Sequence, residues 1–169
     1  PSAGITWAVA KKQSLSMNYG RRINRPDYSV LNPFNKQLSE LSLEKGNPFL
    51  KPEIVNNLEL GYTLAYKYNF KLAYSRTDDK ITRLIGPDES DSRASFVSWD
   101  NLSTQEVYSF NASLPVTIKE WWDAFFNISA NYTDNKADYG NGAVVNVQNF
   151  GYSIDQQHKF KLPKSFNEE

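Results

Sequence analysis

The chain has 169 residues, with 19 lysines and arginines against 19 aspartates and glutamates, so its formal net charge is zero. This balance provides no general attraction to nucleic acid, and we expect no nucleic-acid partner. The absence of cysteine excludes disulfides, thiolate nucleophiles and cysteine-ligated metal centres. The mean hydropathy is −0.61, and the longest apolar run, residues 7–10, is far too short for a membrane helix. Composition still permits a transmembrane β-barrel, because its alternating strands average out as polar.

Seven stretches of the chain place apolar residues at every second position, with small or polar residues between them. This period of two is typical of β-strands, whose successive side chains point to opposite faces. No apolar position in these stretches carries a charge. We therefore predict an all-β fold, an antiparallel up-and-down meander of about seven strands. The apolar positions span residues 5–9, 15–19, 58–66, 70–74, 108–116, 126–132 and 150–154.

The spacing of these stretches favours a membrane barrel over a soluble sandwich. Between consecutive stretches lie 5, 38, 3, 33, 9 and 17 residues, so that short and long connections alternate. In a meander, all the short connections then lie at one end of the sheet, as in bacterial outer-membrane barrels. Aromatic residues gather at two short turns, where an interfacial girdle would lie. These residues are Tyr66, Tyr68, Phe70, Trp121 and Trp122.

The first long connection and the strands beside it carry a recognisable set of motifs. The set resembles the barrel region of TonB-dependent outer-membrane receptors of Bacteroidota, and the segment from Gly46 to Glu53 is its most specific part. In chain order the motifs are Tyr19-Gly20-Arg21-Arg22-Ile23-Asn24-Arg25-Pro26, Leu31-Asn32-Pro33-Phe34, Gly46-Asn47-Pro48-Phe49-Leu50-Lys51-Pro52-Glu53, Leu58-Glu59-Leu60-Gly61-Tyr62, Asn101-Leu102 and Lys161-Leu162-Pro163-Lys164. Residues 78–100 and 134–148 match only as variable loops.

The resemblance implies a parent receptor with a plug domain inside a barrel of about 22 strands, in the outer membrane of a Gram-negative bacterium. Residues 1–169 would be one segment of the barrel domain, part of a larger transmembrane β-barrel, with the plug and the remaining strands outside this chain. Such receptors import a scarce nutrient, namely an iron chelate, a vitamin or a glycan. The implied partners are outer-membrane lipid and lipopolysaccharide, the plug, the TonB complex and a small-molecule or glycan substrate. The alternative is a soluble all-β module that binds carbohydrate or protein.

Two sets of residues are candidates for functional surfaces. For binding at the outer loops and rim we single out the arginines and aromatic residues of the long connections. The arginines could bind lipopolysaccharide phosphates or an anionic substrate, although we favour the interpretation that they tie the loop to its neighbours. The binding candidates are Arg21, Arg22, Arg25, Tyr28, Phe34 and Trp99. The predicted lumen-facing residues are Glu59, Thr63, Ser109, Asn111, Asn127 and Asn131.

Catalytic and metal-binding patterns are weak throughout the sequence. His158 is the only histidine and has no partner at ligand spacing, so we interpret it as exposed or interfacial. The acidic groups Asp78-Asp79 and Asp88-Glu89-Ser90-Asp91 lack the glycine of a calcium loop, and a solvated loop is favoured. The serines lack the histidine that acts as general base in a usual catalytic triad. We predict no enzymatic activity and no cofactor.

The last predicted strand departs from the pattern. Its apolar parity continues into Gln156 and His158, which predicts either a bulge that shifts the register or a stretch outside the hydrocarbon band. Because single-chain bacterial barrels have even strand numbers, seven strands are not expected to close by themselves. We therefore expect an open, curved antiparallel sheet with unpaired edges or a non-native closure, for example with another copy of the chain.

Overall fold

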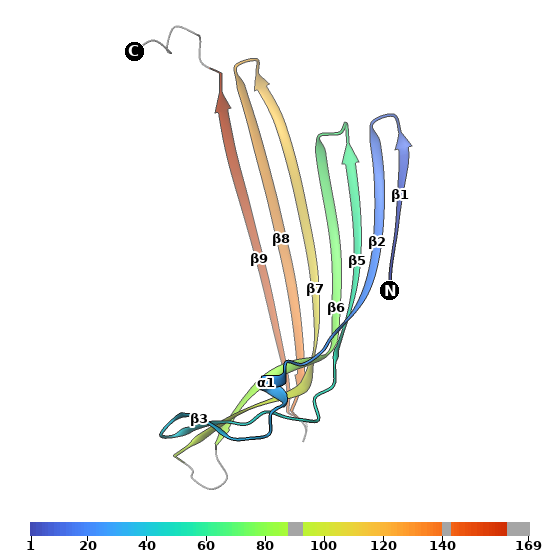
Figure 1. Ribbon diagram of the computed structural model, residues 1–169. Coiled ribbons are helices and arrows are strands. Elements are labelled where there is room, and N and C mark those ends of the chain that lie inside the picture. Colours follow the sequence, from blue (N-terminus) through green and yellow to red (C-terminus); the bar gives the residue numbers. More distant parts are fainter. Residues whose placement is uncertain (88–92, 140–142, 162–169) are drawn as a thin grey trace, which may run out of the picture.

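The computed structural model describes residues 1–87, 93–139 and 143–161. Seven long strands form one antiparallel sheet, and their order across the sheet follows their order in the chain (Figure 1). The predicted all-β meander of about seven strands is confirmed. The long strands are β1 Ser2–Ala10, β2 Gln13–Asn24, β5 Glu53–Leu64, β6 Tyr68–Pro87, β7 Ser95–Lys119, β8 Trp122–Asp138 and β9 Val144–Phe160.

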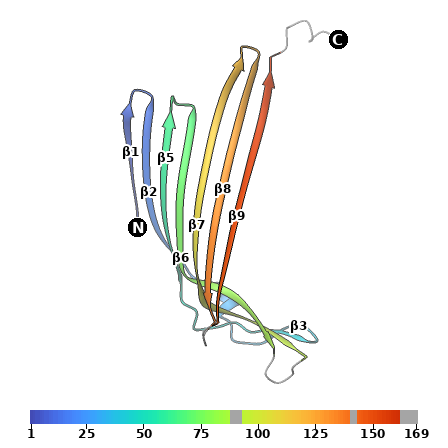
Figure 2. The same cartoon turned by 180° about the vertical axis from the view of Figure 1, so that it is seen from behind.

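The connections divide between the two ends of the sheet. The short turns at 11–12, 65–67 and 120–121 lie at one end, which we call the turn end. The connection from β2 to β5, residues 25–52, lies at the opposite loop end, where β6 and β8 also end (Figures 1 and 2). The predicted segregation of the connections is therefore confirmed.

Residues 25–52 form a crossing loop with structure of its own. It contains α1 (Tyr28–Leu31), β3 (Lys36–Ser39) and β4 (Ser42–Glu44). β4 pairs in parallel with β7, on the edge of β7 that lies away from β6, so the loop crosses the β6–β7 hairpin. Sequence periodicity did not predict these three elements, because each has four residues or fewer. α1 is the only helix among the described residues, and it is not long and apolar enough to cross a membrane.

The expectation that residues 78–100 and 134–148 are variable loops is wrong for most of these positions. β6 continues to Pro87 and β7 already begins at Ser95, while β8 and β9 reach Asp138 and Val144. Both faces of these strand ends carry polar residues. The alternation that identifies a half-buried strand is therefore lost, although the backbone pairing continues.

The β6–β7 hairpin is kinked at a β-bulge. The register between β6 and β7 shifts between Thr77 and Lys80, and Asp79 has a positive φ of 54°. A bulge bends the strand that carries the extra residue. Figures 1 and 2 show that the outer part of this hairpin turns away from the other strands, together with β3.

The last strand follows β8 without interruption. The pairing runs from Trp122 opposite Phe160 to Asp138 opposite Val144 with no register shift. The bulge considered for this strand is therefore wrong. Gln156 and His158 keep the apolar parity and lie opposite Phe126 and Ala124.

The sheet has a single layer, and no second layer covers its apolar face. Ile5 is 67% exposed and Leu72 is 55% exposed. The apolar residues buried in the described part of the chain are few and mostly small, namely Leu50, Val97, Ala112, Ala124 and Ala137. A soluble sandwich would bury its apolar parity in a dry core, so this alternative is contradicted. β1 pairs only with β2, and β9 only with β8, in the described residues, which gives the expected open sheet.

Gly46 lies where two parts of the crossing loop meet. A Cβ atom at this position would approach Asn32 O to 2.4 Å and Val30 O to 2.6 Å. Both contacts are to backbone, so we expect Gly46→Ala to destabilise the loop by roughly 1–3 kcal/mol. Gly20→Ala is the matched control, because a Cβ there meets nothing within 4 Å. Protease cleavage of residues 25–52 in the folded protein measures the effect, and equal rates for the two variants would contradict it.

Candidate functional site

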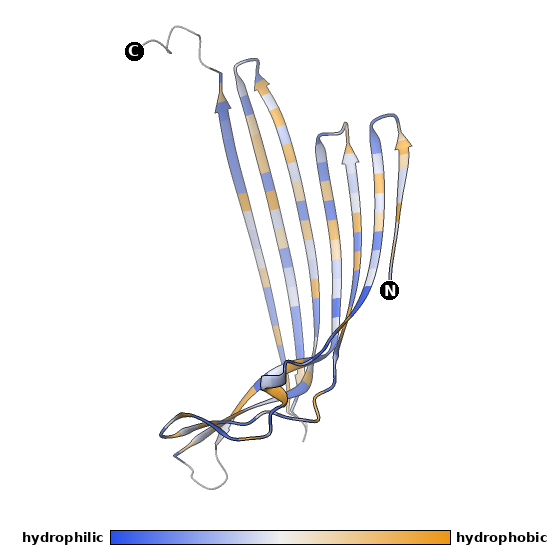
Figure 3. Cartoon of the chain, in the orientation of Figure 1, coloured by the Kyte–Doolittle hydropathy of each residue, from blue (hydrophilic) through white to orange (hydrophobic). Residues whose placement is uncertain are grey.

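The strand register divides the sheet into an apolar face and a polar face. Residues of one parity pair with residues of the same character on each neighbouring strand, so that they form rows across the sheet (Figure 3). A one-residue slip would exchange the two faces. The middle row of the apolar face is Ile5, Met17, Leu60, Leu72, Phe110, Ala130 and Tyr152.

A row that is aromatic except at Leu58, which we call the tyrosine row, bounds the apolar face toward the loop end. The rings of Tyr74 and Tyr108 lie 4.9 Å apart, and those of Tyr108 and Tyr132 lie 6.2 Å apart. Sequence analysis missed this row, although each member is the apolar residue nearest the loop end of its stretch. The row comprises Tyr19, Leu58, Tyr74, Tyr108, Tyr132 and Phe150.

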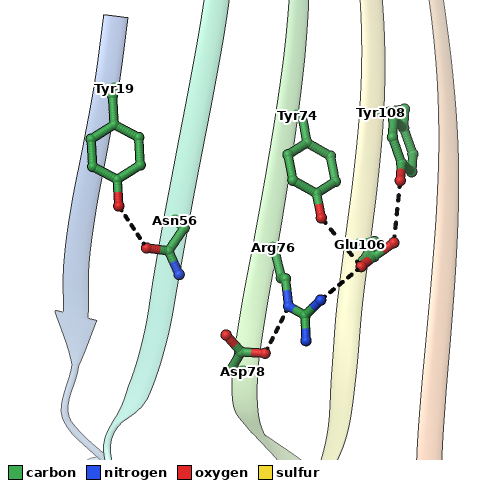
Figure 4. A network of polar contacts seen from close by, with 7 residues as sticks. All are labelled: Tyr19, Asn56, Tyr74, Arg76, Asp78, Glu106 and Tyr108. Carbon is green, nitrogen blue, oxygen red and sulfur yellow. Dashed lines mark hydrogen bonds and ion pairs between the residues drawn. The ribbon is translucent and has the colours of Figure 1, made fainter.

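The next row toward the loop end is polar, and the tyrosine hydroxyls point toward it (Figure 4). Tyr74 Oη and Tyr108 Oη each donate to Glu106, both at 3.2 Å. Arg76 bridges Glu106 at 3.3 Å and Asp78 at 2.9 Å. The apolar face therefore ends abruptly, with rings on one side of the boundary and hydroxyls on the other. Aromatic side chains with this orientation are typical of a membrane interface.

A second aromatic group occupies the turn end of β8 and β9. Trp122 stacks on Phe160 with centroids 5.7 Å apart, and Trp121 lies 6.0 Å from Trp122. The Trp122 indole N–H donates to His158 Nδ1 at 3.1 Å. His158 is exposed in this group, in agreement with the exposed or interfacial position expected for it. Aromatic residues thus lie at both ends of the apolar face.

The polar face carries all six of the predicted lumen-facing residues. Glu59, Ser109 and Asn131 lie in one row, while Thr63, Asn111 and Asn127 lie in the two rows nearer the turn end. Hydrogen bonds join neighbouring strands along this face, for example Ser113 Oγ to Asn127 Oδ1 at 2.8 Å. The ion pair of Lys71 with Glu59, at 2.9 Å, also lies on it. That this face lines a lumen remains a prediction.

The three candidate arginines do not form a cluster. Arg21 has the apolar parity and lies beyond the tyrosine row, whereas Arg22 lines a groove of about 190 Å³ on the polar face with Asn57 and Glu59. Arg25 lies in the crossing loop. Period two sends adjacent residues to opposite faces, which explains the separation. No guanidinium of the three has a polar partner among the described residues, so the favoured tying role is not supported.

The aromatic candidates of the outer connections divide into exposed and half-buried side chains. Tyr28 and Phe34 are 81% and 79% exposed. Trp99 was expected to be an exposed loop residue, which is wrong: it lies in β7, half-buried, because β7 extends further than expected. Its indole N–H is buried without a hydrogen-bond partner among the described residues. Phe49 is 87% exposed and was not singled out.

Phe34 and Phe49 occupy equivalent positions in two Asn-Pro-Phe turns. The Phe34 N–H donates to Asn32 Oδ1 at 3.1 Å, and the Phe49 N–H donates to Asn47 Oδ1 at 2.9 Å. Such asparagine turns fix the local backbone. The repeated tripeptide is visible in the sequence and could have identified the pair.

The α1 helix beside these turns begins with a charged cap. The Ser29 N–H and hydroxyl both donate to the Asp27 carboxylate, at 2.9 and 2.7 Å. These two hydrogen bonds lower the pKa of Asp27. The cap satisfies an N–H group of the first helical turn.

The described residues contain no group of three or more histidines, aspartates or glutamates placed to hold a metal ion. Asp78 pairs with Arg76, and Asp79 lies in the bulge. The acidic group at 88–91 lies outside the described residues.

The model of the outer membrane protein beta-barrel family matches residues 1–169. The chain belongs to this family. A search of curated protein sequences gives no significant match.

Solved structures support the fold of this barrel chain. The siderophore receptor PirA from Pseudomonas aeruginosa has a TM-score of 0.67 and 12% identity, over 97% of this chain and 36% of that one. A mutant ferric enterobactin receptor (PfeA) from Pseudomonas aeruginosa, in complex with enterobactin, gives 0.57 and 14%, over 97% and 33%. PirA from Acinetobacter baumannii gives 0.51 and 15%, over 94% and 33%. At these identities the similarity shows the fold, and the chain spans about a third of each receptor.

Glu106 is the shared acceptor of the network in Figure 4, so its removal tests the boundary of the apolar face. Glu106→Ala leaves the Tyr74 and Tyr108 hydroxyls and one side of Arg76 without their acceptor. We expect a lower unfolding temperature of the full-length protein in detergent, and a smaller loss for Glu106→Gln, which keeps one acceptor oxygen. Glu120→Ala, in the last short turn, is the control. A Glu106→Ala protein as stable as this control would show that the network is unimportant.

Proposed function

We propose that this chain is a barrel segment of a TonB-dependent outer-membrane receptor, which imports a scarce nutrient across the outer membrane of a Gram-negative bacterium. One observation carries the proposal: the apolar face of a single-layered sheet is uncovered and is bounded by aromatic residues at both ends. In water such a face would forgo about 25 cal/mol for each Å² of apolar surface left unburied. Lipid hydrocarbon tails would cover the apolar face without this cost.

The polar face supports a wet lumen. Its side chains are mainly hydroxyls and amides, which find partners on the neighbouring strand or in water. Backbone groups within a membrane must be paired internally, and the uninterrupted ladders meet this requirement within the sheet. The free edges of β1 and β9 would pair with further strands of the parent barrel. The plug domain would occupy the lumen, and the TonB complex would act through parts outside this chain.

The cargo is the least determined part of the proposal. The solved receptors of similar fold are described as siderophore and ferric enterobactin receptors, which favours an iron chelate. A vitamin or a glycan remains an alternative. The sequence motifs favour a Bacteroidota receptor within this class. Under this proposal Arg21, just beyond the tyrosine row, would meet the anionic head groups of lipopolysaccharide.

Charges placed on the two faces test the orientation of the sheet. Leu60 and Asn111 lie in adjacent rows, one on each face. We expect Leu60→Arg to destabilise the full-length receptor by roughly 2–4 kcal/mol, because the charge enters hydrocarbon, and Asn111→Arg to have little effect. Urea unfolding in lipid vesicles measures both variants. Equal losses would contradict the assignment of the faces.

Transport itself is tested with the full-length parent in cells that lack other receptors for the probes. We expect a radiolabelled ferric siderophore, cobalamin or oligosaccharide to accumulate, and the accumulation to stop when TonB is deleted. A folded receptor that accumulates none of the three probes, or accumulates one without TonB, would contradict the proposal.

A further inference from the structure

The bulge in β6 leaves backbone groups that the ladder to β7 does not pair. The register shifts on both sides of Lys80. A bulge interrupts the ladder locally, and unpaired backbone groups are costly where water is partly excluded. The Asp79 carbonyl and the Ile81 N–H, which flank Lys80, therefore need partners from elsewhere.

Two side chains supply these partners. Asn101 Nδ2 donates to the Asp79 carbonyl at 2.6 Å, and the Ile81 N–H donates to Glu53 Oε1 at 2.9 Å. Asn101 belongs to β7, and Glu53 begins β5. The second bond is stronger than a neutral one, because its acceptor is ionised. Residues from both neighbouring strands thus hold the kink.

The same two side chains hold both ends of the crossing loop. The Lys51 N–H donates to Asn101 Oδ1 at 2.7 Å, and Asn101 Nδ2 donates to the Lys51 carbonyl at 3.0 Å. The Asn101 amide therefore pairs with Lys51 as a ladder residue would. At the other end of the loop, Asn24 Nδ2 donates to Glu53 Oε2 at 3.2 Å.

The middle of the loop is fastened along the edge of β7. The Lys45 N–H donates to the Val97 carbonyl at 2.9 Å, and Asn47 Nδ2 donates to the Trp99 carbonyl at 3.0 Å. Leu50, which lies in the chain between Asn47 and Lys51, is buried. The loop thereby covers the part of β7 that lies beyond the end of β8.

We propose that Asn47, Glu53 and Asn101 form a lock that fastens the crossing loop to the kinked β6–β7 hairpin, so that loop and hairpin form one fixed cap at the loop end. The cap presents the exposed rings of Phe34 and Phe49. In the proposed receptor, incoming cargo would meet this cap. That step rests on the proposed function, whereas the lock itself does not.

The chemistry of the lock makes substitutions of nearly equal size informative. In Asn101→Asp, a carboxylate oxygen replaces the amide that donates to the Lys51 and Asp79 carbonyls, so that acceptors face one another. The Glu53 carboxylate accepts hydrogen bonds from Asn24 Nδ2 and from the Ile81 N–H. In Glu53→Gln, an amide NH₂ group replaces one of the two oxygens and faces one of these donors. Each variant therefore loses at least one hydrogen bond without creating a cavity.

The test treats intact cells that carry the full-length protein with trypsin, which cleaves after Lys36 and Lys45 within the loop. For Asn101→Asp and Glu53→Gln we expect cleavage to be about tenfold faster, because cleavage follows the population of the open loop. Asn35→Asp and Glu40→Gln are matched controls, since both residues are exposed in the loop and have no polar side-chain partner among the described residues. The heat-dependent shift of the barrel on gels reports folding.

Faster loop cleavage with an unchanged gel shift supports the lock, and cleavage at the control rate in folded variants overturns it. If Asn101→Asp does not fold, Asn47→Asp decides the question, because it removes the donor to the Trp99 carbonyl, keeps the oxygen that accepts from the Phe49 N–H and leaves the kink intact. Faster loop cleavage in that variant supports the lock, and wild-type cleavage overturns it. The measurement needs no cargo, so it separates failure of the lock from failure of the transport proposal.

Discussion

Continuous register between neighbouring strands is the constraint on which the two-faced sheet depends. Because side chains alternate, a slip of one residue in any pairing would turn a whole strand and place hydroxyls among the apolar rows. The pairings of β2 with β5 and of β8 with β9 run without a shift. Shifts occur near strand ends and beyond the tyrosine row, at Ala8, Lys80 and Thr117. In the described part of the long strands, register shifts are therefore confined to the ends of the pairings and to the part of the sheet beyond the tyrosine row.

The two ends of the sheet differ in how much irregular backbone they contain. At the turn end, short connections leave little room for variation, and the rings of Trp122, the first residue of β8, and Phe160, the last residue of β9, stack on each other. At the loop end, the bulge at Asp79 changes the direction of the hairpin, and the crossing loop is built around that change. The most specific motif of the sequence, from Gly46 to Glu53, lies where loop and hairpin meet. Its glycine, asparagine and glutamate each have a structural task there, which accounts for the residue types better than a direct role in ligand binding does.

The low sequence identity between this chain and the solved receptors is compatible with a shared fold, because the physical requirements on a barrel strand are few. A barrel strand needs apolar residues at every second position and small polar residues between them, and many sequences meet that need. At 12% identity the sheet still superposes with a TM-score of 0.67. Pattern and register, more than particular side chains, therefore maintain the sheet. Particular side chains matter at the boundary of the apolar face, as Glu106 illustrates, and in the loops.

The sequence by itself determined which residues share a face and at which end the connections lie, because alternation and spacing are local properties that each strand displays independently. It correctly placed Glu59, Ser109 and Asn127 on one face, and the open sheet is one of the two outcomes that it allowed. It could not determine where β6 and β7 end, since their outer parts are polar on both faces, nor that Arg21 and Arg22 have no polar partner among the described residues. Only the tertiary structure aligned Tyr19, Tyr74, Tyr108 and Tyr132 in one row and brought Asn101 to Lys51 across fifty residues of chain. These contacts depend on register and on a bulge, and a single strand carries no signal for either.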